Sequence, residues 1–501
     1  MRTLIRLAFL LVAAAAFALL ARAIRHRDRD DARHALAARG QGLEIPGSFA
    51  RVDGDALLHE TAGFAKVLCT SAFYTGIEPR RAAAASGFVV SPLASRKAVV
   101  DTVIDRVRRE VRLTLADGRV RSARAFGRQG CVTLQLGEDS VHFTPVPVRP
   151  RLPDAESTPW PMGDRLVRAP WPAEVDSAGF AAALADFAGP PEAMTLAVVI
   201  THRGRLLGEW YAPGIGLHTP LQGWSMGKSV AGTLVARLIQ LGVYRLDQPA
   251  PIPEWETPGD PRQKIRIMDL MRMSSGLRLR APADPDYDPS LGYPEHLFTY
   301  TGPMDMYHFA ATRPVQWPPN TVGRYRNSDP LIAGYLVKLG AASLGIDPHE
   351  FPQRALFDSI GVRDAILETD VFGNFLVQGY VMMAARDWAR LGNLYLQDGV
   401  WNGTRLLPEG YVDHVRTVAP AWKADGRPEY GGGFFWVNGA GKPPLPKDAF
   451  WMSGSGGQTT MILPSQELVV VRLGLAGGAD AAALTNDRAF RRLFAAVRSR
   501  R

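Results

Sequence analysis

Apolar residues recur at helical spacing in the segment that follows position 225. The residues that share this face are Val230, Leu234, Val235, Leu238 and Ile239. Gly242 follows the last of them, and glycine commonly caps a helix because it tolerates a left-handed backbone. We therefore expect a long helix that starts close to Ser225 and ends before Gly242.

Short segments bounded by turn residues predict strands on both sides of a mostly helical middle. The expected strands are 195–201 and 206–211, on either side of 202–205, and 459–463 and 468–473, on either side of a turn at 464–466. Further helices are expected at 180–187, 384–395 and 481–497. Because strands lie at both ends of this unit, we predict one antiparallel sheet that is built from both of its termini.

A smaller unit precedes this one in the chain. Residues 45–150 contain a hairpin pattern in which the alternating segments 111–115 and 119–123 flank Ala116-Asp117-Gly118. A proline-rich segment, 145–172, then looks like a linker. We place the boundary there, with a β-containing region at 45–150 and the larger domain at 155–501.

The N-terminus has the pattern of an export leader. Arg2 and Arg6 precede an apolar run from 7 to 20, and Ala21-Arg22-Ala23 offers a cleavage site. The run is short for a membrane span, which favours a signal peptide, whereas the basic stretch after it favours an uncleaved anchor. Either interpretation of residues 1–23 predicts an exported protein, periplasmic or anchored to the cytoplasmic membrane and facing outward.

Two cysteines, Cys69 and Cys131, are compatible with an oxidising compartment. They would pair there as a disulfide; the alternative is two separate buried thiols. Their spacing fits no metal-ligand pattern.

Composition excludes several classes of function. The 501 residues are 46% hydrophobic and 21% charged, as in an ordinary globular protein. The net charge of +9 comes from arginine that is not interleaved with aromatic residues, so we expect no nucleic-acid partner. His59-Glu60 and His349-Glu350 lack a second histidine at the spacing of a zinc site, and no nucleotide-binding glycine loop is present. We expect neither a metal nor a cofactor.

The candidate chemistry lies in Gly223-Trp224-Ser225-Met226-Gly227-Lys228. Chance alone would supply roughly 0.3 Ser-x-x-Lys pairs in this chain, so the context matters more than the match. The pair falls at the start of the long helix, where Ser225 and Lys228 share a face. Lys228 could be the base that activates Ser225 if burial lowers its pKa, or it could stay charged and hold another base in its anionic form.

The same residues also match the G-x-S-x-G elbow of α/β-hydrolases. That fold requires an apolar strand directly before the elbow, but residues 213–222 are rich in glycine and proline. The last histidine, His414, also lacks the expected turn around it. Both observations disfavour the α/β-hydrolase fold.

Four further segments, together with the Ser-Lys pair, make the chain resemble the penicillin-recognising serine hydrolases. This superfamily includes class C β-lactamases, D-alanyl-D-alanine carboxypeptidases and hydrolases of 6-aminohexanoate oligomers. The four segments are 265–277, the Tyr-x-Asn motif Tyr325-Arg326-Asn327, 385–399, and Ser453-Gly454-Ser455-Gly456-Gly457-Gln458. The resemblance covers about 160–500. It implies an α+β fold: a β-lactamase/transpeptidase-like antiparallel sheet flanked by helices, with a helical subdomain, beside the small β-containing N-terminal unit.

The resemblance also implies roles for individual residues. Tyr325 would be the general base, with its phenolate favoured by Lys228, and later the acid for the leaving group. Asn327 would bind Lys228 and the carbonyl side of the substrate. The backbone N–H groups of Ser225 and Gln458 would form the oxyanion hole, with Gly457 allowing close approach of the strand.

The last motif departs from the family pattern. Ser455 stands where β-lactamases and carboxypeptidases carry a cation or an imidazole that meets the substrate carboxylate, and a hydroxyl cannot form that charge-assisted bond. Arg324, Arg326 or Lys442 could supply the charge instead.

These observations predict an exported, cofactor-free serine hydrolase that acts on a small-molecule carboxylic ester or amide through an acyl-enzyme on Ser225. One alternative is a β-lactamase or D,D-carboxypeptidase. The other is a non-catalytic envelope protein that uses this fold for binding.

Overall fold

A computed structural model describes residues 27–497, except 29, 48–50, 53 and 168. The predicted leader, residues 1–23, lies outside the described residues. Within the described part, no helix combines the length and the apolar character needed to cross a membrane.

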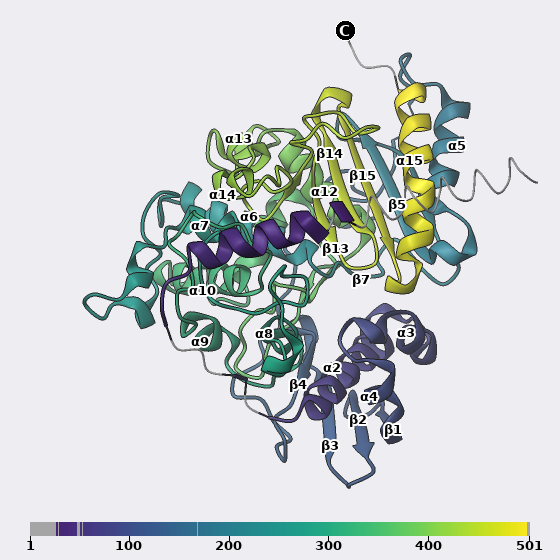
Figure 1. Cartoon of the computed structure of the whole chain (residues 1–501). Coiled ribbons are helices and arrows are strands. Elements are labelled where there is room, and N and C mark those ends of the chain that lie inside the picture. Colours follow the sequence, from purple (N-terminus) through teal and green to yellow (C-terminus); the bar gives the residue numbers. More distant parts are fainter. Residues whose placement is uncertain (1–26, 29, 48–50, 53, 168, 498–501) are drawn as a thin grey trace, which may run out of the picture.

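A six-stranded antiparallel sheet forms the centre of the larger part of the molecule (Figure 1). Its order is β12 (Trp436–Val437), β13 (Phe450–Gly454), β14 (Gln458–Leu463), β15 (Leu468–Gly474), β5 (Thr195–His202) and β6 (Arg205–Tyr211). Strands from early and late in the chain meet where β15 pairs with β5. This confirms the predicted fold class and the sheet built from both termini.

Helices cover both faces of the sheet (Figure 1). On one side lie α5 (Ser177–Ala188) and α15 (Ala479–Ala496), and on the other α6 (Met226–Gln240) and α12 (Ala385–Leu396). Successive side chains of a strand point to opposite faces, so Val198 packs toward α5 and α15 while Val199 joins the cluster around α6. The central strands β5 and β15 are accordingly buried along their whole length.

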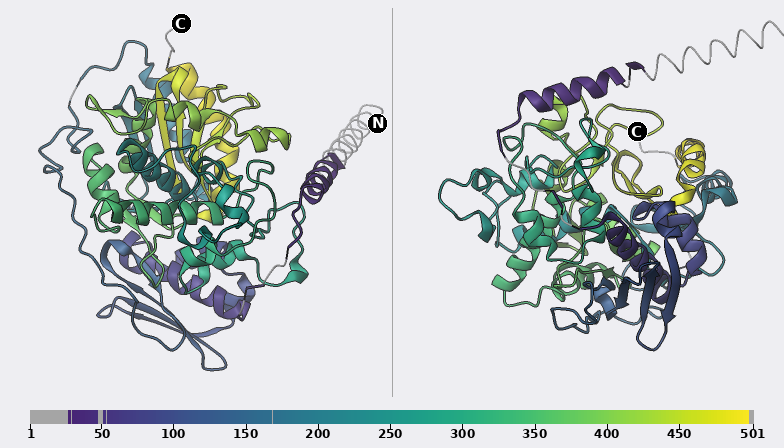
Figure 2. Two further views of the ribbon diagram at one scale, coloured as in Figure 1. Left: turned by 90° about the vertical axis from the view of Figure 1, so that its left-hand side faces the viewer. Right: turned by 60° about the horizontal axis from the view of Figure 1, so that its bottom comes forward.

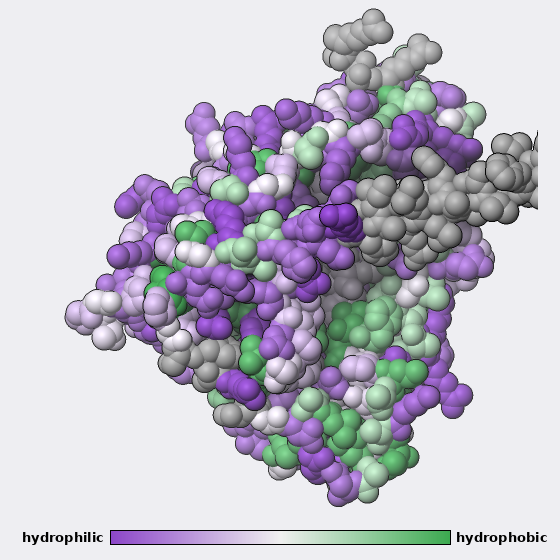
Figure 3. Space-filling view, viewed as in Figure 1, coloured by the Kyte–Doolittle hydropathy of each residue, from purple (hydrophilic) through white to green (hydrophobic). Residues whose placement is uncertain are grey.

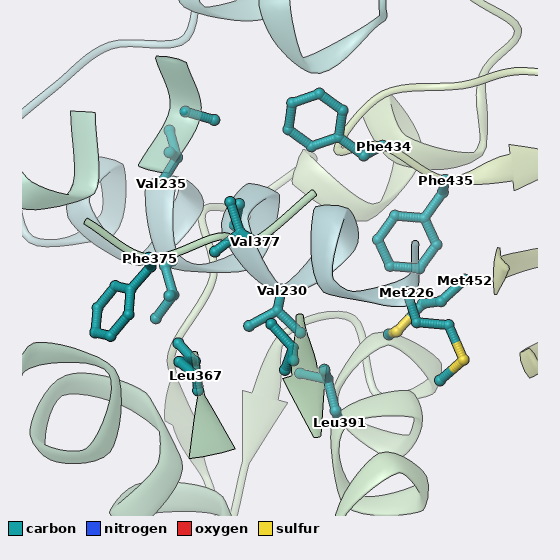
Figure 4. Packing of buried hydrophobic residues seen from close by; sticks show 14 of the residues in the cluster. Met226, Val230, Val235, Leu367, Phe375, Val377, Leu391, Phe434, Phe435 and Met452 are labelled. Carbon is teal, nitrogen blue, oxygen red and sulfur yellow. The ribbon is translucent and has the colours of Figure 1, made fainter. Parts of the chain in front are cut away.

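Helix α6 lies deep in the core. Figure 4 shows Met226 and Val230 of this helix among apolar side chains from several other segments, including Leu391 and Phe435. Its predicted C-terminal glycine, Gly242, has a φ of 79°, as a left-handed cap requires. The helix is therefore a rigid support for Ser225 at its N-terminus.

Further helices, of which α10 is the longest, and short strands fill the rest of the larger part. The helices are η4 (Pro191–Ala193), η5 (Pro253–Trp255), η6 (Pro261–Lys264), α7 (Ile267–Met271), η7 (Pro289–Leu291), α8 (Glu295–Thr301), α9 (Met306–Ala311), α10 (Ser328–Ser343), η8 (Gln353–Phe357), α11 (Asp358–Ile360), α13 (Tyr411–Arg416), α14 (Pro420–Ala424), η9 (Pro464–Gln466) and η10 (Ala476–Gly478). The strands are β7 (Leu221–Gln222), β8 (Ile366–Leu367) and β9 (Val381–Met383) in one small sheet, with β10 (Val400–Trp401) and β11 (Thr404–Arg405) in another.

The N-terminal region combines a four-stranded antiparallel sheet with helices. Its elements are α2 (Ala56–Thr70), η1 (Ser71–Thr75), α3 (Pro79–Ser86), η2 (Gly87–Val89), α4 (Leu93–Lys97), β1 (Val99–Asp105), β2 (Glu110–Leu115), β3 (Val120–Ala125), η3 (Gly127–Gln129) and β4 (Cys131–Thr133). The predicted hairpin is present as β2 and β3. Apolar side chains gather on the outer face of this region (Figure 3), where Phe88, Leu93 and Val100 are exposed.

Helix α2 joins this region to the rest of the molecule. Its Leu68 packs with Val111 and Leu113 of β2, whereas Val67 belongs to the cluster around α6. A disulfide links Cys69 of α2 to Cys131 of β4. The region therefore has a core of its own and also shares the core of its neighbour.

The proline-rich segment runs along the outside of the molecule toward α5 (Figure 2, left). It is held in place by hydrogen bonds: the Trp160 indole N–H donates to Gly204 O at 2.7 Å, and the Arg390 guanidinium donates to Pro161 O at 2.7 Å and Gly163 O at 2.8 Å. The linker is thus fixed to the surface that it crosses.

A helix over 30–42 also lies on the surface (Figure 2). Trp317 Nε1 donates to Gly40 O at 2.8 Å, and Arg324 Nη2 donates to Leu36 O at 3.1 Å. Arg39 pairs with Asp425, which also binds Arg324.

Candidate active site

Ser225 lies at the tight turn that leads into α6. Trp224 has a φ of 48°, an uncommon value for a residue with a side chain, and Ser225 is the N-cap of the helix. Gly223 lies directly against Trp388. A Cβ at this position would lie 2.5 Å from the Trp388 ring, so the chain can pass here only with a glycine. The turn leaves Ser225 partly exposed at the start of a buried helix.

Lys228 is buried and contacts Ser225 directly. The side-chain nitrogen of Lys228 lies 2.8 Å from Ser225 Oγ, and it also forms a hydrogen bond with the carbonyl oxygen of Gln378. Only 1% of the side chain surface is exposed, and this burial lowers the pKa of Lys228 well below its usual value. Loss of water disfavours the charged form, so the arrangement favours a neutral amine beside the serine hydroxyl.

Tyr325 completes a group of three side chains. The Lys228 nitrogen lies 4.9 Å from the centre of the Tyr325 ring, and the Tyr325 hydroxyl is within hydrogen-bonding reach of Ser225. Burial and the neighbouring Tyr300 raise the pKa of Tyr325 above its usual value. Burial thus favours the protonated phenol over the phenolate, and the role of Tyr325 as general base stays a prediction.

Two residues at this site have no counterpart in the sequence-based prediction. Tyr300 of α8 lies within hydrogen-bonding reach of Ser225 and Asn327, and its hydroxyl donates to Gln378 O at 3.4 Å. Gln378 is fully buried, and its side-chain amide donates to Thr299 O at 2.8 Å. The Gln378 carbonyl thus holds both Lys228 and Tyr300. Neither residue belongs to a recognisable motif, so the pattern of the chain carries no signal for them.

The side-chain amide of Asn327 contacts α8. Its N–H group donates to His296 O at 3.1 Å and to Thr299 Oγ1 at 3.0 Å, both in α8. Its buried Oδ1, the atom that could accept from Lys228, has no hydrogen-bond partner among the described residues, so the predicted bond to Lys228 is not formed in this structure. The amide therefore fastens α8, and with it Tyr300, next to the nucleophile. The second hydrogen bond of Lys228 is made instead to the backbone carbonyl of Gln378.

The predicted Ser455 to Gln458 segment is a tightly held turn between β13 and β14. Gly454, the last residue of β13, approaches the turn before Ser225 so closely that a Cβ would lie 2.1 Å from Gly223 O. The Gln458 side chain accepts from Gly474 N at 2.8 Å and donates to Gly474 O at 2.6 Å. Ser455 is exposed, and Gly457 has a φ of 73°, which suits glycine.

Arg472 fixes the carbonyl groups of the same turn. Its Nη1 donates to Gly456 O at 3.2 Å and to Gly457 O at 3.1 Å. The end of the strand is therefore held rigidly beside the nucleophile turn.

Two of the three residues considered as alternative cations are already paired. Arg324 and Arg326 are each 4% exposed and bind Asp425 at 3.4 Å and Asp284 at 3.2 Å. Lys442 is exposed on a loop. Neither buried arginine is available to bind a substrate carboxylate.

Comparisons with known proteins agree with this arrangement. The chain is 25% identical over 232 residues to the 6-aminohexanoate-dimer hydrolase of Paenarthrobacter ureafaciens, an alignment that covers 45% of this chain and 57% of that relative. The chain thus spans little more than half the length of this curated relative.

Solved structures resemble the chain in part. A proposed 6-aminohexanoate-dimer hydrolase from Bacillus anthracis has a TM-score of 0.49 and 21% identity, and the match covers 60% of this chain and 79% of that one. A penicillin-binding protein homologue from Caulobacter crescentus has a TM-score of 0.47 and 14% identity, with coverage of 65% and 99%.

A match to a protein-family model shows the family to which the chain belongs. The Beta-lactamase family matches residues 180–489, well over half of the chain and the part that contains the sheet, α6 and the residues around Ser225. The chain therefore belongs to the beta-lactamase family.

Proposed function

We propose that this protein is a serine hydrolase that cleaves a carboxylic ester or a small amide through an acyl-enzyme on Ser225. The observation that carries the proposal is the 2.8 Å contact between Ser225 Oγ and a buried Lys228 whose pKa is lowered. A neutral amine at this distance can accept the proton of a serine hydroxyl, which is otherwise a poor nucleophile.

The first half of the reaction forms the acyl-enzyme. Lys228 takes the proton of Ser225 as Oγ bonds to the carbonyl carbon of the substrate. The tetrahedral intermediate then collapses, the bond to the leaving group breaks, and the Tyr325 phenol donates its proton to the departing oxygen or nitrogen. Lys228 returns a proton to Tyr325, so the group is neutral again.

The second half releases the acid. A water molecule loses its proton to Lys228 and attacks the carbonyl carbon of the ester on Ser225. The bond between that carbon and Oγ then breaks, and Lys228 returns the proton to Ser225 Oγ as the acid leaves. The negative oxygen of both intermediates would be stabilised by the N–H of Ser225, at the first turn of α6 where amides lack helical partners, and by that of Gln458.

The substrate class follows from the charges around the site. Ser455 is neutral, and Arg324 and Arg326 are paired with aspartates, so a substrate without a carboxylate at this position fits best. The name of the relative from Paenarthrobacter ureafaciens, a hydrolase of an amide-linked dimer, supports an amide as the bond that is cleaved.

Turnover of p-nitrophenyl acetate and butyrate and of simple alkyl amides tests the proposal. Wild-type protein should hydrolyse members of this panel, and Ser225→Ala and Lys228→Ala should lose at least 100-fold in kcat/KM. Nitrocefin on the same preparation tests the β-lactamase alternative. Equal activity of wild type and Ser225→Ala would refute the proposed function.

We also propose that the protein acts outside the cytoplasm. The link between Cys69 and Cys131 supports this, because disulfides persist mainly in oxidising compartments. A C-terminal alkaline phosphatase fusion should be active in cells, and an inactive fusion that accumulates in the cytoplasm would contradict export.

A further inference from the structure

A partly enclosed pocket lies where the N-terminal region meets the hydrolase part. The N-terminal region contributes Val67, Ile77 and Ala82 to its lining, and the larger part contributes Leu221, Trp224 and Leu475. The free space inside is about 50 Å³. Since about 10–15 Å³ of such space holds one water-sized group, the pocket has room for a chain of roughly three to five carbons.

The pocket adjoins the candidate active site. Trp224, in its wall, directly precedes Ser225, and Gly474, also in the wall, holds the side chain of Gln458. The ring of Tyr380, a further wall residue, lies 6.0 Å from the Trp224 ring and 5.7 Å from the Tyr300 ring. A group that fills the pocket therefore lies beside the nucleophile turn and the proposed oxyanion hole.

The lining is suited to an apolar group. Its five side-chain hydroxyls already have partners. Ser71 donates to Ile77 O, Thr70 donates to Glu368, and Tyr380 donates to Tyr300 O. Ser86 accepts from Ala476 N, and Thr75 accepts from Ile77 N. The structure describes all of the lining side chains. Among them, Gln222 has a buried side-chain oxygen without a hydrogen-bond partner. An alkyl chain would thus meet carbon on most sides, with one acceptor available for a donor on the substrate.

The position of the pocket indicates which part of the substrate enters it. The leaving group must lie next to the proton donor, which the proposed mechanism identifies as Tyr325. Neither Tyr325 nor either of its neighbours in the chain lines the pocket, which lies instead along Trp224 and Gly474. The part of the substrate that stays on the enzyme is therefore the part that faces this pocket.

We propose that the N-terminal region completes a subsite for a short, unbranched, apolar acyl chain. This inference rests on the proposed function of Ser225 and adds the acyl specificity of the same site. It also gives the N-terminal region, which lies outside the matched family segment, a direct role in substrate selection.

Variants that change the size of the pocket in opposite directions test this subsite. Ala82→Leu fills the pocket from α3, and Leu475→Ala enlarges it. Ala84→Leu is the matched control, because Ala84 lies on the same helix but is exposed. The assay is kcat/KM for p-nitrophenyl acetate, butyrate and octanoate, with the thermal unfolding midpoint measured for each protein.

The subsite predicts a shift in chain-length preference. Ala82→Leu should lower the butyrate-to-acetate ratio of kcat/KM by about tenfold, the scale of a lost fit in an apolar pocket. Leu475→Ala should raise the octanoate-to-butyrate ratio, and Ala84→Leu should match wild type. Because a ratio compares two substrates on one protein, partial misfolding does not produce opposite shifts.

Two different failures can be told apart. Turnover that depends on Ser225, with the same chain-length profile in all four proteins, would overturn the subsite and leave the proposed function intact. Turnover that survives in Ser225→Ala, or wild-type inactivity on every ester and amide, would overturn the proposed function and the subsite with it.

Discussion

A buried ion pair fastens the N-terminal region to the segment whose Gln378 carbonyl binds Lys228. Lys66 of α2 lies 3.2 Å from Glu368, and their side chains are 1% and 0% exposed. Glu368 also accepts from Thr70 Oγ1 at 2.9 Å and from Cys131 N at 3.0 Å. Its own backbone N–H donates to Tyr380 O, two residues from Gln378.

Replacement of Lys66 by methionine removes the cation and leaves Glu368 buried without it. At 3.2 Å and an effective dielectric constant of about 20, the attraction between the two charges is about 5 kcal/mol. Loss of one partner from a buried pair commonly costs about 3–5 kcal/mol, because the remaining charge stays away from water. We therefore expect Lys66→Met to lower the free energy of unfolding by about 3–5 kcal/mol.

Urea unfolding followed by circular dichroism measures this change. The double variant Lys66→Met/Glu368→Gln removes both charges, so it should be more stable than Lys66→Met alone. A Lys66→Met protein within 1 kcal/mol of wild type would refute the inference that this pair holds the two parts together.

Three further predictions concern the site and the disulfide. Burial lowers the pKa of Lys228, so kcat/KM should be high above that pKa and should fall as the pH decreases through it. The midpoint of this fall in kcat/KM should lie well below pH 10.5. A midpoint at or above pH 10.5 would contradict a neutral Lys228 at working pH. Tyr325→Phe should lose about 10²–10⁴-fold in kcat/KM on alkyl amides, whose leaving groups need a proton, and less on p-nitrophenyl esters, whose leaving group does not; equal losses would exclude the proton-donor role. Replacement of Cys69 and Cys131 by alanine should lower the free energy of unfolding by about 4 kcal/mol, given a separation of 62 residues, and an unchanged urea midpoint would contradict this.

The sequence predicts those strands that turn residues separate into short segments. The strands β5, β6, β14 and β15 and the β2–β3 hairpin lie within a residue or two of their predicted positions. The central strands β5 and β15 are buried along their whole length, so they show as short apolar runs rather than as an alternation. Helix α2 was not predicted. Its residues 61–70 are all buried, between its own sheet on one side and the hydrolase part on the other, so it lacks the polar face that makes a helix visible in sequence.

The site was predictable only where side chains form local motifs. Ser225 and Lys228 are one helical turn apart, and the structure places them in contact, with Tyr325 beside them. Gln378 contributes a backbone carbonyl, which any residue could supply, so it has no sequence signature. The orientation of Asn327 toward α8 depends on how the helices pack, and spacing along the chain does not determine that.

The measurement that tests the central claim most directly is mass spectrometry of the enzyme quenched with acid during turnover of p-nitrophenyl butyrate. The account predicts an added butyryl group on the peptide that contains Ser225, and none in Ser225→Ala. Active enzyme that carries its acyl group on another residue, or an equal adduct in Ser225→Ala, would contradict the claim that Ser225 is the nucleophile.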